Sequence, residues 1–521
     1  MNKKIMKSKF SNAICFFVLG GTLILSSCNK KSLTDLNIDP NTTQTAVPAY
    51  LFTGAILAMP ADNYSVIAEG MQYYSTYKEV PAVGDKFYSF GGTVANFQSY
   101  YTDKLNRLIQ LEAAVQGPDD VNKKALVQVL KVYEFDQLTD VAGDIPYFDA
   151  MQGKDNLTPK YDAQKDIYLD MFKTLDEAAT SLDPSKPTFG NADLLYKGDI
   201  TKWKKFTYTL MLRLAMRVSN ADPAMAQTWV QKAVAGGVMS ANDDIAFIKY
   251  ADAPGGMNPQ TLGMRNGNYI SPGGDNVEGG KYTATFIDYL KSTRDPRLPV
   301  VSVVWVPTAP GATSYTADTS FALQKGMVSG SLNTKPTDFD TYSEPSLVVI
   351  SVAAPIIILG PSESNLLLAE AALRGWYSGM TAEEAYNEGV KYGMKQWGFY
   401  PAIAPHPNTI TDAQINDYLQ LNPYPSAGSF DQQLEAISDQ KWLTLFGNDY
   451  EIYANWRRTG YPVLTPVNYP GNVTGGQMFR RFSLPNSENL TNQANYLEAL
   501  QRQGFAELNG DNLLTRVWWD K

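Results

Sequence analysis

Residues 363–397, ESNLLLAEAALRGWYSGMTAEEAYNEGVKYGMKQW, decide the fold class of this chain. Apolar residues recur at three- and four-residue spacing in Glu363–Trp376 and again in Ala382–Trp397, which predicts two amphipathic helices. Thr381, followed three residues later by Glu384, forms a capping box that starts the second helix. A short glycine-containing turn joins the two helices, which therefore pack as an antiparallel pair. The pair resembles a tetratricopeptide unit, although the strict repeat of such units is absent.

Helical periodicity extends to both sides of this pair and makes the chain mainly α-helical. We expect a helical scaffold over residues 93–240 and 360–460. Residues 251–282 contain eight glycines, so we expect no helix interior there. Residues 307–345 are rich in Thr, Ser, Pro and Gly. We therefore expect a loop-rich lobe with a few short strands at about 250–345, packed on the scaffold, and long irregular stretches of this kind tend to carry function. Further helices are predicted at Thr93–Val115, Asn122–Asp140, Ala163–Leu182, Asp199–Val218, Thr283–Ser292, Asp431–Phe446 and Asn492–Arg502, and a helix capped by Asp222 begins at Pro223.

The first residues of the chain have the features of an export signal that ends in a lipidation site. Four lysines among the first nine residues precede an apolar run from Ala13 to Leu25, which is too short to span a bilayer. Leu25-Ser-Ser-Cys28 resembles the lipobox of bacterial lipoproteins, in which the cysteine is acylated and becomes the first mature residue. We predict a lipoprotein signal peptide at 1–27, a lipidated tether at 28–48 and one domain at 49–521.

Composition excludes several classes of function. The formal net charge of −9 at pH 7 disfavours binding to nucleic acid. Cys15 would leave with the signal peptide and Cys28 would be lipidated, so thiol nucleophiles and cysteine-ligated metals are excluded. His406 is the only histidine, which excludes polyhistidine zinc sites and leaves a lone general base as its one catalytic role. Its flanking prolines predict a surface loop. We expect no cofactor and no metal site, although calcium bound by carboxylates stays open.

Aromatic residues in irregular segments are the best candidates for binding a sugar. Flat rings stack on apolar sugar faces, while amide, carboxylate and guanidinium groups hydrogen-bond the hydroxyls. One candidate cluster precedes the turn at 81–84, and the other lies in the glycine-rich stretch, where the backbone can approach a ligand closely. The alternative is that these tyrosines pack on the scaffold. The candidate ligand-binding residues are Tyr73, Tyr74, Tyr77, Arg265, Asn266, Asn268, Tyr269 and Asp275.

Several motifs occur in an order that resembles one known family. With the lipobox, they are similar to the SusD/RagB family of outer-membrane nutrient-binding lipoproteins, particularly its second SusD-like subgroup. The resemblance covers nearly the whole mature chain. The motifs are Asp140-Val-Ala-Gly-Asp-Ile-Pro-Tyr147, Arg294-Asp-Pro-Arg-Leu-Pro299, Gln440-Lys-Trp-Leu-Thr-Leu-Phe446, Trp456-Arg-Arg-Thr-Gly-Tyr-Pro462 and Val517-Trp-Trp-Asp520.

This resemblance implies a mainly helical fold of tetratricopeptide-like pairs and no catalytic activity. It also implies a lipid-anchored protein on the outer face of the outer membrane, which captures glycans or, in some members, peptides. The implied partner is a TonB-dependent, SusC-like transporter barrel, on which the protein acts as a hinged lid. Outward-facing relatives often carry acids soon after the lipidated cysteine, whereas here the first acid is Asp35.

Two other classes of function stay open. A secreted carboxylate glycosidase would need two acids about 5–10 Å apart in a cleft, and no sequence feature isolates such a pair. A purely structural helical-repeat scaffold would hold other surface proteins without binding a small ligand.

Several motif residues have structural roles in our interpretation. We expect Trp442 in the core and Arg457 and Arg458 paired with carboxylates. Trp518 and Trp519 should hold the C-terminal tail against the body of the protein.

Overall fold

The helix pair at 363–397 is present in the computed structural model as α14 (Pro361–Leu373) and α15 (Ala382–Lys395), which pack against each other. The backbone N–H of Glu384 donates to Thr381 Oγ1 at 3.1 Å, and the N–H of Thr381 donates to Glu384 Oε2 at 2.8 Å. The predicted helix pair and its capping box are therefore confirmed.

The structure describes residues 47–60, 66–78, 86, 97–267, 280–330, 333–505 and 513–521. Of these, Pro48–Lys521 belong to one compact unit. Within the described ranges, no helix has both the length and the apolar composition needed to cross a membrane.

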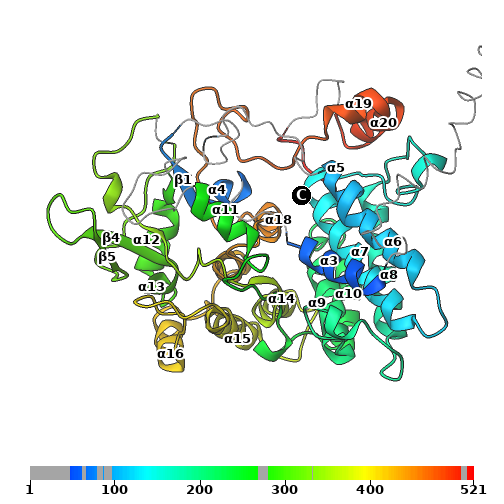
Figure 1. The fold of residues 1–521 in the computed structure, drawn as a ribbon, viewed down its shortest axis with the longest axis horizontal. Helices are drawn as coiled ribbons and strands as arrows, with labels where there is room; N and C mark the ends of the chain where they lie inside the picture. The colour runs from blue at the N-terminus through cyan, green and yellow to red at the C-terminus, as the bar shows by residue number, and fades with distance from the viewer. Residues whose placement is uncertain are drawn as a thin grey trace, which may run out of the picture. The chain divides into compact units, whose positions relative to one another are not determined.

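Helices dominate this unit, while strands are few and short, which confirms the predicted fold class (Figure 1). Successive helices along the chain pack as pairs, as a tetratricopeptide-like scaffold requires. The pairs besides α14 and α15 are α7 (Val121–Ala142) with α8 (Gln164–Ser181), α9 (Ile200–Arg217) with α10 (Pro223–Gly236), and α17 (Phe430–Thr444) with α18 (Asp449–Thr459). The other helices are α3 (Pro48–Ala58), α4 (Val66–Gly70), α5 (Phe97–Ser99), the π-helix η1 (Tyr100–Leu105), α6 (Asn106–Ala114), α11 (Pro259–Gly267), α12 (Ala284–Ser292), α13 (Leu298–Val301), α16 (Asp412–Leu421), α19 (Asn486–Thr491) and α20 (Gln493–Arg502), with 3-10 turns η2 (Gly153–Asp155), η3 (Gly190–Ala192), η4 (Asn242–Asp244), η5 (Phe339–Thr341) and η6 (Gln396–Phe399).

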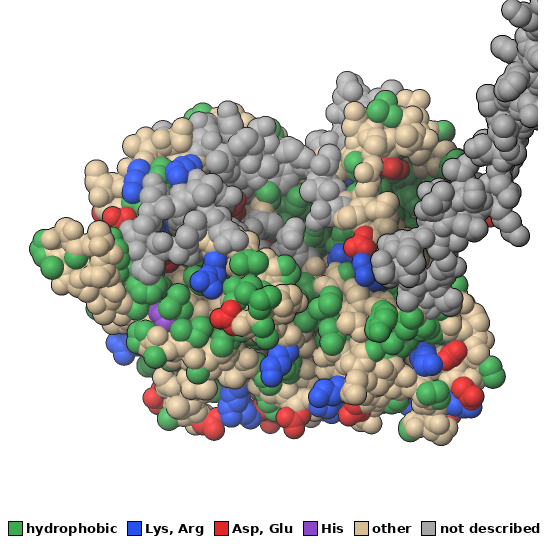
Figure 2. All heavy atoms as spheres, viewed as in Figure 1, with side chains coloured by type: hydrophobic (Ala, Val, Ile, Leu, Met, Phe, Trp, Pro, Cys, Tyr) green, Lys and Arg blue, Asp and Glu red, His purple; other side chains and the backbone are tan. Residues whose placement is uncertain are grey.

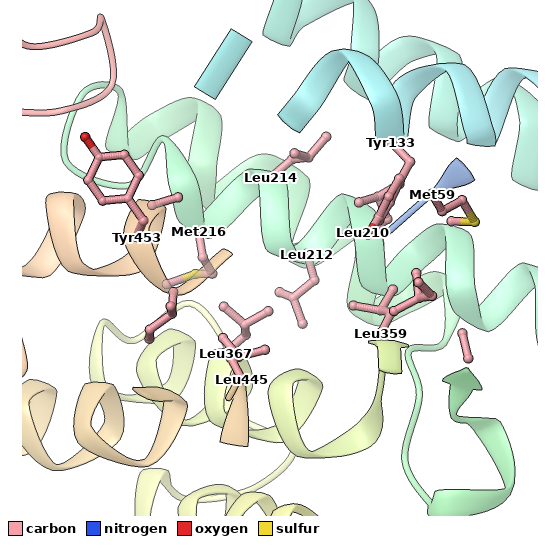
Figure 3. Packing of buried hydrophobic residues seen from close by; sticks show 14 of the residues in the cluster. Met59, Tyr133, Leu210, Leu212, Leu214, Met216, Leu359, Leu367, Leu445 and Tyr453 are labelled. Carbon is pink, nitrogen blue, oxygen red and sulfur yellow. The ribbon is translucent and has the colours of Figure 1, made fainter. Parts of the chain in front are cut away.

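Helix α9 runs through the hydrophobic core. Leu210, Leu212, Leu214 and Met216 are all fully buried, so apolar packing surrounds this helix and is not confined to one stripe. Figure 3 shows these side chains among residues of α7, α14 and α18, and all three helices contact α9. The two halves of the predicted scaffold, 93–240 and 360–460, therefore share one core.

The arginines of α9 are buried as well, in ion pairs with acids from the neighbouring helices. Arg213 donates to both carboxylate oxygens of Glu363 on α14, at 2.7 and 2.6 Å. Arg217 lies 2.9 Å from Asp140 of α7 and donates to Glu451 of α18. Buried charges are tolerated only when they are paired in this way, so the pairs specify how the four helices meet.

We expected Arg457 and Arg458 to pair with carboxylates, and the structure shows such a pair for Arg458 alone of the two. Arg458 donates to both oxygens of Glu370 at 2.6 Å, as predicted. Arg457 instead donates to the backbone carbonyls of Asp140 and Arg480, at 2.6 and 3.1 Å. Its guanidinium lies 4.5 Å from the ring centroid of Trp519, a cation–π arrangement. The prediction of a carboxylate partner for Arg457 was therefore wrong.

The C-terminal tail is held against the body, as predicted. Trp519 is fully buried, and its indole Nε1–H donates to Asp140 Oδ1 at 2.7 Å. Trp518 is half-buried, with its ring centroid 5.9 Å from that of Tyr168.

The strands form small antiparallel sheets, mostly in the predicted lobe. β4 is the central strand of three, between β5 and β6, while β1 pairs with β3 and β2 pairs with β7. The strands are β1 (Tyr74–Thr76), β2 (Ala246–Ile248), β3 (Gly280–Tyr282), β4 (Ser302–Pro307), β5 (Tyr315–Asp318), β6 (Glu344–Pro345) and β7 (Ile356–Leu359).

Two expectations about irregular segments were wrong. The glycine-rich stretch includes the helix α11, which begins after Asn258, whose Oδ1 accepts from the N–H groups of Gln260 and Thr261. Gly263 lies inside this helix, at a cost of about 1 kcal/mol relative to alanine.

His406 is 4% exposed and packs edge-on against Trp305, although its prolines predict a surface loop. This burial lowers the pKa of His406.

Candidate ligand-binding site

Tyr74 of the first predicted cluster lies in a β-ribbon with the last residues of the glycine-rich stretch, although the two segments are far apart in the sequence. In the β1–β3 pair, Tyr74 lies opposite Tyr282 and Thr76 lies opposite Gly280. The chain leaves β1 at the same end of the ribbon at which it enters β3. Tyr77 and Lys78 therefore follow β1 at the end of the ribbon where Gly280, the last glycine of the stretch, begins β3.

Tyr73 and Tyr74 are packing residues in this structure. The ring of Tyr73 is fully buried and stacks on Trp442 at 5.2 Å, and its hydroxyl donates to the Trp442 carbonyl at 2.6 Å. Tyr74 is 4% exposed and stacks on Tyr282 at 5.3 Å. Neither ring offers a free face to a sugar, so the packing alternative describes both residues. Trp442 lies in the core, as predicted.

Tyr77 begins a second, smaller aromatic group at the end of the ribbon. Its ring meets Phe339 edge-on at 5.1 Å, and both residues pack with Met327. Tyr342 lies against this group and is half-buried. We call these four residues, with Lys281, Lys325, Lys335, Asp338 and Glu344 around them, the ribbon cluster.

Lysine side chains surround the rings of the ribbon cluster. The Nζ atoms of Lys281 and Lys335 lie 4.4 and 5.0 Å from the ring centroid of Phe339, and Nζ of Lys325 lies 4.5 Å from that of Tyr342. On the face shown in Figure 2, Lys and Arg side chains gather at the upper left, near the position of β1 in Figure 1. Ammonium groups donate hydrogen bonds readily, so this surface suits a ligand rich in hydroxyl or carbonyl oxygens.

The acids of the ribbon cluster are each paired with a lysine. Glu344 pairs with the buried Lys281, and burial raises the pKa of Glu344 while Lys281 opposes that effect. Asp338 pairs with Lys325 at the surface, where the hydrogen bond lowers the pKa of Asp338. A glycosidase needs one protonated acid and one ionised partner across a cleft. Two lysine-paired carboxylates do not provide that arrangement.

Only some of the other predicted residues can be placed. Arg265 is exposed in the last turn of α11, and Asn266 lies in the same turn. Cys28, Asn268, Tyr269 and Asp275 lie outside the described residues. Within the described ranges, no group of three or more His, Cys, Asp or Glu side chains could hold a metal ion.

Sequence reasoning missed the residues that surround Tyr77. Phe339, Tyr342 and Lys325 lie in the stretch 307–345, which the sequence marks as irregular and of functional interest without singling out any residue. A signal for them was available, since aromatic and lysine residues recur there without helical or strand periodicity. The contact between Tyr77 and Phe339 spans much of the chain, so no local pattern indicates it.

Comparison with known proteins identifies relatives along most of the chain. The model of the second SusD-like family, described as "Starch-binding associating with outer membrane", matches residues 40–485. No curated protein sequence matches. A solved structure described as a chitin-binding protein is 31% identical, with a TM-score of 0.76 over 91% of this chain and 100% of its own.

Two further structures share the architecture. A chitin-binding SusD homolog from Flavobacterium johnsoniae is 25% identical, with a TM-score of 0.72 over 91% of this chain and 98% of its own. A SusD homolog from Bacteroides fragilis is 23% identical, with a TM-score of 0.76 over 92% of this chain and all of its own, and indicates the fold alone.

Proposed function

This chain belongs to the second SusD-like family, and we propose that it is a non-catalytic lipoprotein that binds glycans at the cell surface. The observation that carries the proposal is the match to a chitin-binding protein along 91% of this chain at 31% identity. The ribbon cluster supports it, because the half-buried ring of Tyr342 and the exposed ammonium groups of Lys325 and Lys335 suit the apolar face and the hydroxyl groups of a sugar.

The ligand class that we propose is an oligosaccharide of N-acetylglucosamine, the unit of chitin. Two relatives are described as chitin-binding, and one of them is the 31% identical protein. The proposed contacts among the described residues are Tyr342, Lys325 and Lys335 of the ribbon cluster, together with Arg265 in the last turn of α11. Asn266, Asn268, Tyr269 and Asp275 complete the proposed set.

The location and the partner follow from the family in this proposal. Acylated Cys28 would anchor the protein in the outer membrane, with residues 28–48 as the tether and 1–27 removed. The polar tether would let the domain hinge on a SusC-like, TonB-dependent barrel and close over its cargo. Mild detergent extraction of the native membrane should then co-purify a large barrel protein. A monodisperse lipoprotein without such a partner would contradict this part of the proposal.

Calorimetric titration of residues 29–521 tests the ligand class. Chitin hexamer should bind, while the matched glucose hexamer with the same linkage, which carries a hydroxyl group in place of each acetamido group, should bind more weakly. A parallel peptide library covers the peptide-binding alternative within the family. Hydrolysis of the chitin hexamer would show a glycosidase and would overturn the proposal that the protein is non-catalytic. Binding of peptides alone would change the proposed ligand from a glycan to a peptide.

A further inference from the structure

A groove lies between the N-terminal helices and the C-terminal pair of this unit, apart from the ribbon cluster. Its volume is about 450 Å³, which is within the range of small-ligand sites. One wall is formed by α5 and η1, another by the segment 146–159, and the third by α19 and Asn492. Figure 1 shows α5 and α19 close together, away from β1.

Hydrogen bonds link the walls of the groove. Gln98 Nε2 of α5 donates to Ser487 Oγ of α19 at 3.1 Å. Asn492 Nδ2 donates to the carbonyl of Pro159 at 2.8 Å. A site formed in advance binds its ligand at a lower ordering cost.

The helical wall has an unusual geometry. Tyr100–Leu105 form a π-helix, a rare conformation that is frequent at functional sites. Tyr101 and Thr102 lie within it and line the groove. The Tyr101 hydroxyl donates to the carbonyl of Pro146 at 2.7 Å, which fixes the ring against the second wall.

The side chains of the groove combine an apolar surface with uncharged polar groups. Met151 and Leu157 contribute the apolar surface, and Leu157 is 79% exposed at the rim. Gln98 and Thr102 add amide and hydroxyl groups. Among the described residues that line it, the charged side chain is Glu488, whose carboxylate accepts from the Tyr161 hydroxyl at 2.7 Å. A lining without a cation disfavours an anionic ligand.

We propose that this groove is a second glycan site, which takes one N-acetylated hexosamine unit of the same oligosaccharide. The acetamido methyl group matches the apolar wall of Met151 and Leu157, the sugar face matches the Tyr101 ring, and the acetamido and hydroxyl groups match Gln98 and Thr102. The inference rests on the proposed function, since it assumes a glycan with acetamido groups. Two sites on one chain would favour long glycans, because the second contact becomes intramolecular.

Two groove variants and one control test this second site in the mature chain. Thr102→Arg places a long side chain in the groove from an exposed position, and Leu157→Asp removes the apolar rim. Phe148→Ala, at a residue 53% exposed that does not line the groove, is the control. Titration with N-acetylglucosamine dimer should give two sites in the wild-type chain and the control, and one site in both groove variants. Affinity for the hexamer should fall roughly tenfold in the variants, because the linked contact is lost.

The outcomes separate this inference from the proposed function. One dimer site in the wild-type chain, with normal hexamer affinity in both variants, overturns the groove site and leaves the proposed function standing. No binding of any N-acetylated oligosaccharide to the wild-type chain overturns both. Variants that bind glycan normally but no longer co-purify a barrel partner would make the groove a partner surface, which also overturns the inference.

Discussion

Replacement of Glu370 by glutamine measures how much the buried charges stabilise this scaffold. The Glu370 side chain is 1% exposed and accepts two hydrogen bonds from Arg458 at 2.6 Å and one from Arg374 at 2.9 Å. Burial alone would raise the pKa of Glu370, but Arg458, with Arg374, outweighs burial and lowers it from 4.5 to about 2. The ionised form is therefore strongly favoured in the folded protein.

The size of the effect follows from this pKa. Each tenfold change in an acid constant corresponds to about 1.4 kcal/mol, so the folded state favours ionised Glu370 by about 3 kcal/mol. Removal of one partner from a buried ion pair costs a similar amount, about 3–5 kcal/mol. Glutamine has nearly the same volume as glutamate, so no cavity contributes. We expect Glu370→Gln to lower the free energy of unfolding at pH 7 by about 3 kcal/mol.

The pH dependence gives a second test of the same reasoning. The folded pKa is lower than the unfolded one, so the contribution of Glu370 is complete above pH 4.5 and is lost as the pH falls towards 2. Urea unfolding followed by tryptophan fluorescence should give a gap between wild type and variant that shrinks below pH 4.5. Glu388→Gln removes an exposed pair with Lys391 and should cost less than about 1 kcal/mol. Equal stability of Glu370→Gln and wild type at pH 7, or a gap that does not change with pH, would refute the argument.

Four further changes test the core, the anchor and the site. Trp442→Ala should lower the free energy of unfolding by about 3–5 kcal/mol through cavity formation, measured by denaturant titration; a loss below 1 kcal/mol would contradict its place in the core. Cys28→Ala should move the protein from the membrane to the soluble fraction, and retention after a high-salt wash would argue against lipidation. His406→Ala should leave glycan affinity unchanged within a few-fold, because its ring is buried against Trp305, so a binding loss without unfolding would show a role in the site. Tyr342→Ala should weaken glycan binding by about 1 kcal/mol with little change in melting temperature; normal binding would exclude this residue from the site.

Features set by nearby residues were predictable from the sequence. The helix at Pro223 begins at Asp222, whose carboxylate accepts from the Met225 N–H at 3.1 Å, as the local pattern indicates. Most predicted helices were confirmed to within a few residues for the same reason, since periodicity and caps act within a few turns.

Features set by contacts between distant segments were not predictable. No local pattern shows that Tyr74 and Tyr77 are buried, because pairing of β1 with β3 stacks Tyr74 on Tyr282 and Tyr77 packs on the distant Phe339. His406 is buried because Trp305, far from it in sequence, covers it. The helix α11 forms in a glycine-rich stretch because Asn258 starts it and tertiary packing outweighs low helix propensity. The choice of candidate site residues assumed that an irregular segment leaves its aromatic rings exposed, and Tyr73 and Tyr74 do not meet that assumption.

The contact between Trp519 and Asp140 has a consequence for the order in which this protein folds. The indole that satisfies the Asp140 carboxylate lies 379 residues later in the chain, so α7 lacks this donor until the tail has been synthesised. Loop closure over such a separation is slow compared with helix formation. A chain truncated before Trp519 would leave the Asp140 carboxylate without its indole donor and an unfilled space in the core beside α7. Loss of the chain from Trp519 onward would therefore leave the core beside α7 incomplete.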